Sequence, residues 1–304
     1  MFFSKKDKKP GRFRLARRIF WLLVAAAVII GAYNASSLSI TVERVDVEID
    51  NLPDGFVGTK IAVLTDVHSS FMMTESFMRK AATLTMNEKP DMIALTGDFV
   101  TGKTKFLNSS VGSFDTKHLD KMVRAFSELK APLGTYAVLG NHDFWSGEEA
   151  VGEIVGRTEK GLGAKWLRNK SITIEKNGAT FLLSGIDDYW HTGSVLEAYK
   201  NVPTDTARVL LSHNPDVVEE LDMLRERADL VISGHTHGGQ IKFPIIGFPV
   251  IPSKYGQRYL SGLIVEAGRA VYVSRGLGTL LAPIRFGALP EVTIITLKKA
   301  RKVS

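Results

Sequence analysis

Short apolar segments recur along the chain, and five of them are followed directly by polar residues. These five segments are residues 61–64, 92–95, 136–139, 209–211 and 230–232. Continuous apolar runs of this length are typical of strands that are buried on both faces. Longer segments with apolar residues at helical spacing lie between several of them. The alternation predicts β-α units and an α/β fold.

The remaining pattern predicts further helices and several hairpin strands. Apolar residues at helical spacing predict helices over 74–87, with Thr74 as the N-cap, and over 118–129, 147–160 and 195–200. Alternation predicts a half-buried strand over 39–50, and Asn177-Gly178 predicts a type I′ turn within a hairpin over 172–186. Further strands are expected at 262–266, 270–274 and 292–297. Hairpins mixed with β-α units indicate two packed sheets with helices outside.

The first residues of the chain differ in character from the rest. Residues 1–18 are basic with one acid, Asp7, and 19–33 form an uncharged apolar run. This run is short for a membrane span of about 20 residues and long for a signal-peptide core of about 7–15 residues. We predict a basic cytoplasmic tail (1–18), a transmembrane signal anchor (19–37) and a catalytic domain (38–304).

Three other interpretations of the apolar run are open. They are a cleaved signal with a weak site at Ala35-Ser36-Ser37, a twin-arginine signal around Arg17-Arg18, and a helix buried in the globular domain. For a single-pass anchor in the cell membrane, the positive-inside rule predicts a cytoplasmic N-terminus. The catalytic domain would then lie on the outer side of the cytoplasmic membrane.

Composition narrows the function in two respects. The chain of 304 residues contains no cysteine, which excludes disulfides and thiolate zinc sites. Its net charge of +7 raises the question of nucleic-acid binding. Much of the basic excess, however, sits at the two ends of the chain, within 5–18 and 298–302. Nucleic acid is therefore not an expected partner.

The polar residues that follow the five apolar segments are rich in Asp, His and Asn. They are Asp66-Val67-His68, Gly97-Asp98, Gly140-Asn141-His142-Asp143, His213 and Gly234-His235-Thr236-His237-Gly238-Gly239-Gln240. In open α/β sheets the carboxyl ends of the strands form the edge where ligands bind. Mixed nitrogen and oxygen donors at this edge predict a metal site.

This ordered set, spread over residues 60–297, resembles the calcineurin-like metallophosphoesterases and, more narrowly, their bacterial membrane-anchored branch. That branch includes broad phosphodiesterases and UDP-2,3-diacylglucosamine pyrophosphatases. The resemblance implies a four-layer α/β/β/α sandwich. It also implies roles for the site residues: Asp66, His68 and His237 on a first metal, Asn141, His213 and His235 on a second, and Asp98 bridging both. His142 would protonate the leaving oxygen or contact the phosphate, and Asp143 would orient His142.

The expected cofactor is a pair of divalent ions, with Mn favoured over Fe or Zn. Two ions about 3.5–4 Å apart activate a water molecule and neutralise charge on the phosphoryl group. The bridging carboxylate is required to hold two cations this close together.

Other residues have two possible roles each. Arg275 and Arg285 lie in a glycine-rich segment, 274–287, and either clamp a phosphate or contact the surface or an anionic lipid. His191 lines the cleft or serves the structure. The apolar loop 243–251 contacts acyl chains or the membrane, or packs in the core.

The resulting hypothesis is hydrolysis of phosphodiester or pyrophosphate bonds in a membrane-proximal or lipid-linked substrate. UDP-2,3-diacylglucosamine is the specific candidate, although its nucleotide is made in the cytoplasm and the predicted domain lies outside. The alternatives are a broad envelope phosphodiesterase or phosphomonoesterase, a nucleic-acid phosphodiesterase, and a metal-stabilised binding module without turnover.

Overall fold

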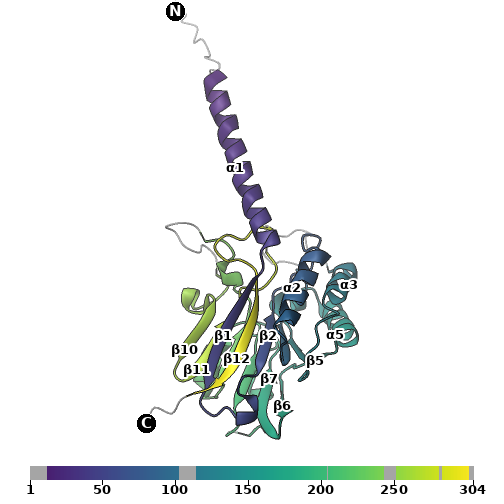
Figure 1. Ribbon diagram of the computed structural model, residues 1–304, viewed down its shortest axis with the longest axis vertical. Coiled ribbons are helices and arrows are strands. Elements are labelled where there is room, and N and C mark those ends of the chain that lie inside the picture. The colour runs from purple at the N-terminus through teal and green to yellow at the C-terminus, as the bar shows by residue number, and fades with distance from the viewer. Residues whose placement is uncertain (1–11, 103–113, 204, 243–250, 281–282, 301–304) are drawn as a thin grey trace, which may run out of the picture.

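Two six-stranded sheets form the centre of the protein (Figure 1). The computed structural model describes residues 12–102, 114–203, 205–242, 251–280 and 283–300. In spatial order the first sheet contains β1 (Thr41–Ile49), β12 (Glu291–Lys299), β2 (Lys60–Leu64), β3 (Met92–Thr96), β4 (Thr135–Val138) and β5 (Ala164–Trp166). The second contains β10 (Gly262–Glu266), β11 (Arg269–Val273), β9 (Leu230–Ser233), β8 (Arg208–Leu211), β7 (Ala179–Gly185) and β6 (Lys170–Lys176).

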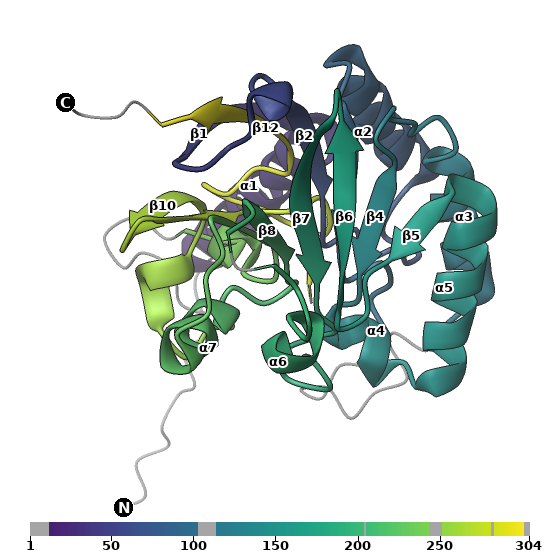
Figure 2. The same cartoon turned by 90° about the horizontal axis from the view of Figure 1, so that it is seen from below.

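Helices cover the outer faces of the two sheets. The first sheet is covered by α2 (Glu75–Asn87), α3 (Thr116–Ala125) and α5 (Glu148–Leu162), with the short α4 (Asn141–Trp145) at its edge. The second is covered by α6 (Val195–Ala198) and α7 (Val217–Leu224). The sheets and helices are joined in part by three short 3₁₀ helices, η1 (Asp54–Phe56), η2 (His237–Gly239) and η3 (Gly256–Tyr259). Figure 2 shows α3 and α5 on one side of the sandwich. The predicted α/β fold is confirmed, and its layers run helix, sheet, sheet, helix.

Three separate cores explain why the central strands are apolar on both faces. In β2, Ala62 and Leu64 pack under the helices, whereas Ile61 and Val63 pack against the second sheet. Successive side chains of a strand point to opposite faces, so a continuous apolar run fills two cores at once. The same alternation in β9 sends Val231 to the third core, beneath α6 and α7.

Two local predictions are confirmed in detail. The Thr74 hydroxyl accepts a hydrogen bond from the Phe77 amide at 3.2 Å and caps α2. Asn177 and Gly178 both have positive φ, 53° and 72°, between the antiparallel strands β6 and β7. This is the backbone that a type I′ turn requires.

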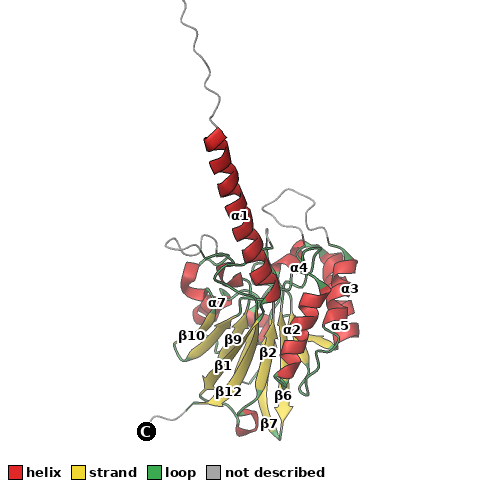
Figure 3. Cartoon of the chain, turned by 45° about the horizontal axis from the view of Figure 1, so that its top comes forward, coloured by secondary structure: helices red, strands yellow, loops and turns green. Residues whose placement is uncertain are grey.

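The strand order places the beginning of β1 at the functional edge of the first sheet. β1 pairs in parallel with β12, and β12 pairs antiparallel with β2. The first residue of β1 therefore lies at the edge where β2, β3 and β4 end. α1 (Arg12–Leu38) precedes β1 directly and consequently leaves the domain from this edge (Figure 3).

α1 extends away from the sheets (Figure 1). Large apolar side chains on it are exposed: Leu15, Ile19, Phe20, Trp21, Leu22, Leu23, Val28 and Ile30. The alternative of a helix buried in the globular domain is therefore wrong. In the part of the chain that the structure describes, no helix is both long and apolar enough to span a bilayer. The predicted transmembrane span over 19–37 has no support in this finding. The predicted apolar loop 243–251 lies almost wholly outside the described residues.

Candidate metal centre

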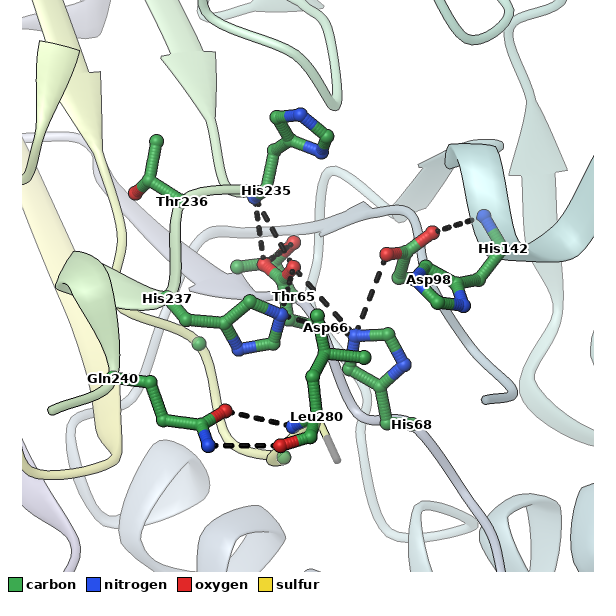
Figure 4. Close-up of polar contacts among 12 residues, drawn as sticks. Thr65, Asp66, His68, Asp98, His142, His235, Thr236, His237, Gln240 and Leu280 are labelled. Carbon is green, nitrogen blue, oxygen red and sulfur yellow. Dashed lines mark hydrogen bonds and ion pairs between the residues drawn. The ribbon is translucent and has the colours of Figure 1, made fainter. Parts of the chain in front are cut away.

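The predicted ligands are buried and come from both sheets. Figure 4 shows five of them, Asp66, His68, Asp98, His235 and His237, gathered at one site. Three of the strands that deliver them, β2, β3 and β4, belong to the first sheet, and β8 and β9 belong to the second. The sequence motifs therefore do not lie along one sheet edge. They come together between the two sheets, at the carboxyl ends of β2, β3 and β4 on one side and of β8 and β9 on the other.

One group of donors consists of Asp66, His68 and His237. Their ligand atoms all lie within 4.8 Å of one another. His237 Nε2 is 3.4 Å from Asp66 Oδ1 and 3.1 Å from His68 Nε2. This is the set predicted for the first metal.

A second group lies around Asp98. Its Oδ2 atom is 3.4 Å from His68 Nε2 and 3.2 Å from His213 Nε2, so the carboxylate stands between the two groups. His235 Nδ1 is 3.2 Å from His213 Nε2. Asn141 Oδ1 is buried and has no hydrogen-bond partner. These are the residues predicted for the second metal and for the bridge.

The protonation of the imidazoles suits a cation. Burial lowers the pKa of His68 to about 3 and holds the pKa values of His235 and His237 well below 6.5. Burial acts in the same direction on His213, but the adjacent Asp98 carboxylate outweighs it and raises the pKa of His213 to about 10. His68, His235 and His237 thus bring neutral imidazoles with converging lone pairs together, and the positive charge that Asp98 favours on His213 is one that a cation would replace. A divalent metal ion fits both features.

Residues behind the ligands orient them. The Thr96 carbonyl accepts from His213 Nδ1 at 2.8 Å, which turns Nε2 of this ring toward Asp98. Both oxygens of Asp66 accept from the His235 amide, at 3.1 and 3.0 Å. Such outer contacts select the tautomer and the direction of a metal ligand. Here they also join the first sheet to the second.

Five of the site residues have a left-handed backbone. The φ angles are 51° for Asp66, 46° for His68, 54° for Asp98, 74° for His235 and 54° for His237. Residues other than glycine rarely adopt this region, and such strain concentrates at functional sites. The abrupt change from extended strand to positive φ directs these side chains into the centre.

Two glycines make room for the carboxylates. A Cβ atom on Gly234 would lie 2.2 Å from Asp66 Oδ2, and one on Gly140 would lie 2.3 Å from Asp98 Oδ1. Both positions immediately precede a ligand segment. Any side chain there would displace a carboxylate from the site.

His142 lies at the predicted place, on α4. Its Nδ1 atom bonds to the Thr101 carbonyl, and its backbone amide donates to Asp98 Oδ1 at 2.9 Å. The His142 ring stands edge-on to His68 with centroids 4.8 Å apart. A nitrogen of the ring lies within 4.8 Å of ligand atoms of His68 and Asp98.

Asp143 has a different partner from the one expected. Its carboxylate accepts from the backbone amides of Asp98, Phe99, Val100 and Gly140, at 2.9–3.4 Å. Asp143 thus holds the loop that carries the bridging carboxylate. The imidazole of His142 is oriented by Thr101 instead.

Arg275 and Arg285 also have roles other than a phosphate clamp or a lipid contact. Arg275 pairs with Glu43 at 2.6 Å and Glu291 at 2.7 Å. Arg285 is fully buried and donates to carbonyls that include those of His237 (3.1 Å), Ala288 and Gly278. It therefore braces the backbone of a metal ligand from behind.

Sequence reasoning missed Thr101 and, in the segment after β7, every residue but His191. Asp188 and Trp190 lie in that segment, and the Trp190 ring is 4.5 Å from the His235 ring. The usable signal was an apolar strand followed by Asp187-Asp188, the same pattern that identified the ligands. His191 stacks on Phe144, with centroids 4.3 Å apart, so it serves the structure.

Comparison with known proteins agrees with this geometry. The family model described as "Calcineurin-like phosphoesterase" matches residues 59–239. An uncharacterised metallophosphoesterase of Aquifex aeolicus (strain VF5) is 31% identical over 90% of this chain and 97% of that protein. The uncharacterised metallophosphoesterase YkuE of Bacillus subtilis (strain 168) is 31% identical over 96% and 99%. Phosphodiesterase YaeI of Escherichia coli (strain K12) is 35% identical over 78% and 82%.

The chain belongs to the calcineurin-like phosphoesterase family. It is a metallophosphoesterase, an enzyme that hydrolyses phosphoester bonds. A binding module without turnover is thereby set aside.

Replacing the bridging carboxylate tests the centre directly. We expect Asp98→Asn to reduce phosphoester hydrolysis to the level of metal-free protein and to lower the bound metal, because the charge between the two donor groups is lost. Activity and metal content by elemental analysis are measured on the same preparation. Near-normal values for both would contradict the bridging position of Asp98.

Proposed function

We propose that the protein uses two divalent cations, with Mn²⁺ favoured, to hydrolyse phosphodiester bonds in substrates at a membrane surface. The observation that carries the two-cation part is the position of Asp98, within 3.4 Å of imidazoles from both donor groups. One carboxylate shared by two sets of nitrogen and oxygen donors supports two closely spaced ions.

The residues of the chain divide the chemistry between them. When bound, the cations supply an activated water molecule and Lewis-acid neutralisation of the phosphoryl oxygens. Asp66, His68 and His237 hold one side of the centre, and Asn141, His213 and His235 hold the other. His142, fixed through Nδ1 by the Thr101 carbonyl, donates a proton from Nε2 to the leaving oxygen.

Similarity to a protein named as a phosphodiesterase supports a diester substrate. YaeI of Escherichia coli is 35% identical to this chain over 245 residues. A lipid-linked pyrophosphate such as UDP-2,3-diacylglucosamine is a narrower proposal within the same chemistry, since both bonds yield a phosphate and a leaving oxygen.

The position of α1 supports a membrane-proximal substrate. α1 leaves the domain from the sheet edge that carries the metal centre, and exposed apolar residues cover it. Phe71, just beyond His68, is 74% exposed, and Trp190, against His235, is 39% exposed. Apolar and aromatic side chains of this kind bind the interface of a bilayer. With Arg14, Arg17 and Arg18 near its start, α1 suits an anionic lipid surface.

The localisation remains the one predicted, as a proposal: the cell membrane, a cytoplasmic N-terminus and a catalytic domain on the outer side. A helix lying on the cytoplasmic surface is the competing arrangement. Protease treatment of intact cells separates the two, because only an outward-facing domain is cleaved.

The substrate proposal is tested on metal-stripped protein that is reconstituted with Mn²⁺. We expect bis(p-nitrophenyl) phosphate to be hydrolysed faster than p-nitrophenyl phosphate, and neither to react without added metal. UDP-2,3-diacylglucosamine forms a third arm. Turnover of this lipid far above the model diester would make it the substrate class, and a preference for the monoester would contradict the diester proposal.

Replacing His142 tests its role as the proton donor. We expect His142→Asn to lower kcat by about 10²–10⁴-fold, the usual contribution of general acid–base catalysis. Metal content should stay at the wild-type level, because His142 is outside the proposed ligand set. A substrate with a p-nitrophenolate leaving group needs little protonation and should lose less activity than an alkyl diester. Loss of metal would instead assign His142 to the ligands.

The membrane part is tested by vesicle flotation. We expect the full chain to float with phosphatidylglycerol vesicles and a chain starting at Ser39 to stay in solution with its diesterase activity intact. A Leu22→Asp and Leu23→Asp double variant should reduce flotation at least about tenfold, because it places two charges on the apolar surface of α1. Equal flotation of all three proteins would contradict attachment through α1.

A further inference from the structure

The segment after β7, residues 187–193, packs against the second half of the metal centre through Trp190. β7 runs parallel to β8, so its carboxyl end lies at the same edge as His213. Trp190 stands edge-on to His235, with an interplanar angle of 86°. Its backbone amide donates to Asp188 Oδ2 at 3.0 Å. This segment thus brings a further carboxylate beside the donors proposed for the second cation.

The buried Asp188 carboxylate has a hydrogen-bond partner on only one of its two oxygens. The residue is 1% exposed, and its Oδ1 atom has no hydrogen-bond partner. Its neighbour Asp187 shows the usual arrangement, because Arg168 binds both of its oxygens at 2.9–3.2 Å. A buried carboxylate oxygen without a hydrogen-bond partner destabilises a fold. A protein that keeps a destabilising carboxylate at position 188 is expected to need it for function.

The electrostatic neighbours of Asp188 are two metal-centre residues, His213 and Asp98, and the adjacent Asp187. Burial raises the pKa of Asp188 to about 7, His213 acts against this rise, and the Asp98 charge adds to it. The carboxylate therefore acts on the half of the centre that contains His213 and His235.

We propose that Asp188 is a positioning residue for the second cation, raising its affinity through negative charge carried by the segment that packs on His235. This inference rests on the proposed two-cation function. It assigns Asp188 to the layer outside the direct ligands, where charge and hydrogen bonding tune the strength of metal binding. The bound cation in turn offsets the unpaired charge of Asp188.

The experiment compares wild-type protein, Asp188→Asn and the matched control Asp187→Asn by calorimetric titration of the metal-free full chain with Mn²⁺. Wild type should show two classes of site. Asp188→Asn should weaken one class at least about tenfold, the range expected for outer-layer residues, and leave the other unchanged. Asp187→Asn removes the same charge from the same segment, but its partner is Arg168, and it should titrate like wild type.

Thermal unfolding of the metal-free proteins separates positioning from a structural role. Asp188→Asn should unfold at the wild-type temperature or above it, because the unpaired buried charge has gone, while the stabilisation by added Mn²⁺ shrinks. Asp188→Ser also lacks the charge and should give the same unfolding temperature and the same loss of stabilisation by Mn²⁺ as Asp188→Asn. It replaces the Asn variant in the experiment if that variant does not fold.

Three results would overturn the proposal. They are unchanged Mn²⁺ affinity in both Asp188 variants, equal weakening of both classes of site, and a marked fall in the unfolding temperature of both metal-free variants. A wild-type protein that binds a single Mn²⁺ would overturn the two-cation function itself, and this outcome is visible before any variant is compared.

Discussion

The structure depends on a cluster of buried charge whose centre is the carboxylate of Asp98. Its Oδ2 atom lies between imidazoles that come from different sheets, His68 and His213. Without positive charge this arrangement would be unfavourable, because carboxylates and converging lone pairs are held together away from water. The protein keeps it by surrounding it with backbone donors. Asp143 alone accepts hydrogen bonds from four backbone amides, three in the Asp98 loop and one from Gly140.

The strained backbone of the ligand residues, with its positive φ angles, follows from the same need to bring the ligands together. Strand ends carry the ligands, and an extended strand directs alternate side chains to opposite faces. A left-handed residue at the turn breaks that alternation, which explains positive φ at Asp66, Asp98 and His235. Gly234 and Gly140 then leave space that no side chain could share with a carboxylate. The three apolar cores supply the stability that offsets these local costs.

α1 and the metal centre lie at the same edge of the first sheet. β12 is inserted between β1 and β2, so the helix before β1 emerges beside the strand ends that carry the ligands. Arg275 reinforces this joint by binding Thr41 and Glu43 of β1 at 3.1 and 2.6 Å. A surface that binds α1 would therefore lie on the same side as the metal centre. Attachment through α1, as proposed, would therefore bring the metal centre close to substrates at that surface.

The sequence alone determined the elements and the candidate ligands. Strand, turn and cap signals are local, so the Thr74 cap, the Asn177-Gly178 turn and the strands before Asp66 and His235 could be predicted from neighbouring residues. The ligand types were also local, since each follows its own strand. Only the tertiary structure decided how these pieces meet. The split of the ligand strands between two sheets and the insertion of β12 depend on pairing between distant segments.

The same reason explains the residues that were assigned differently. Arg285 appeared available for phosphate because its sequence neighbours are glycine-rich, yet its donors are taken by carbonyls that reach it through folding, including that of His237. Asp143 follows His142 in the chain but serves Asp98, which comes from another strand. Asp188 matched the ligand pattern, but its burial and its free oxygen exist only in the folded protein. Local chemistry thus determined which side chains could act, and long-range packing decided what each of them contacts.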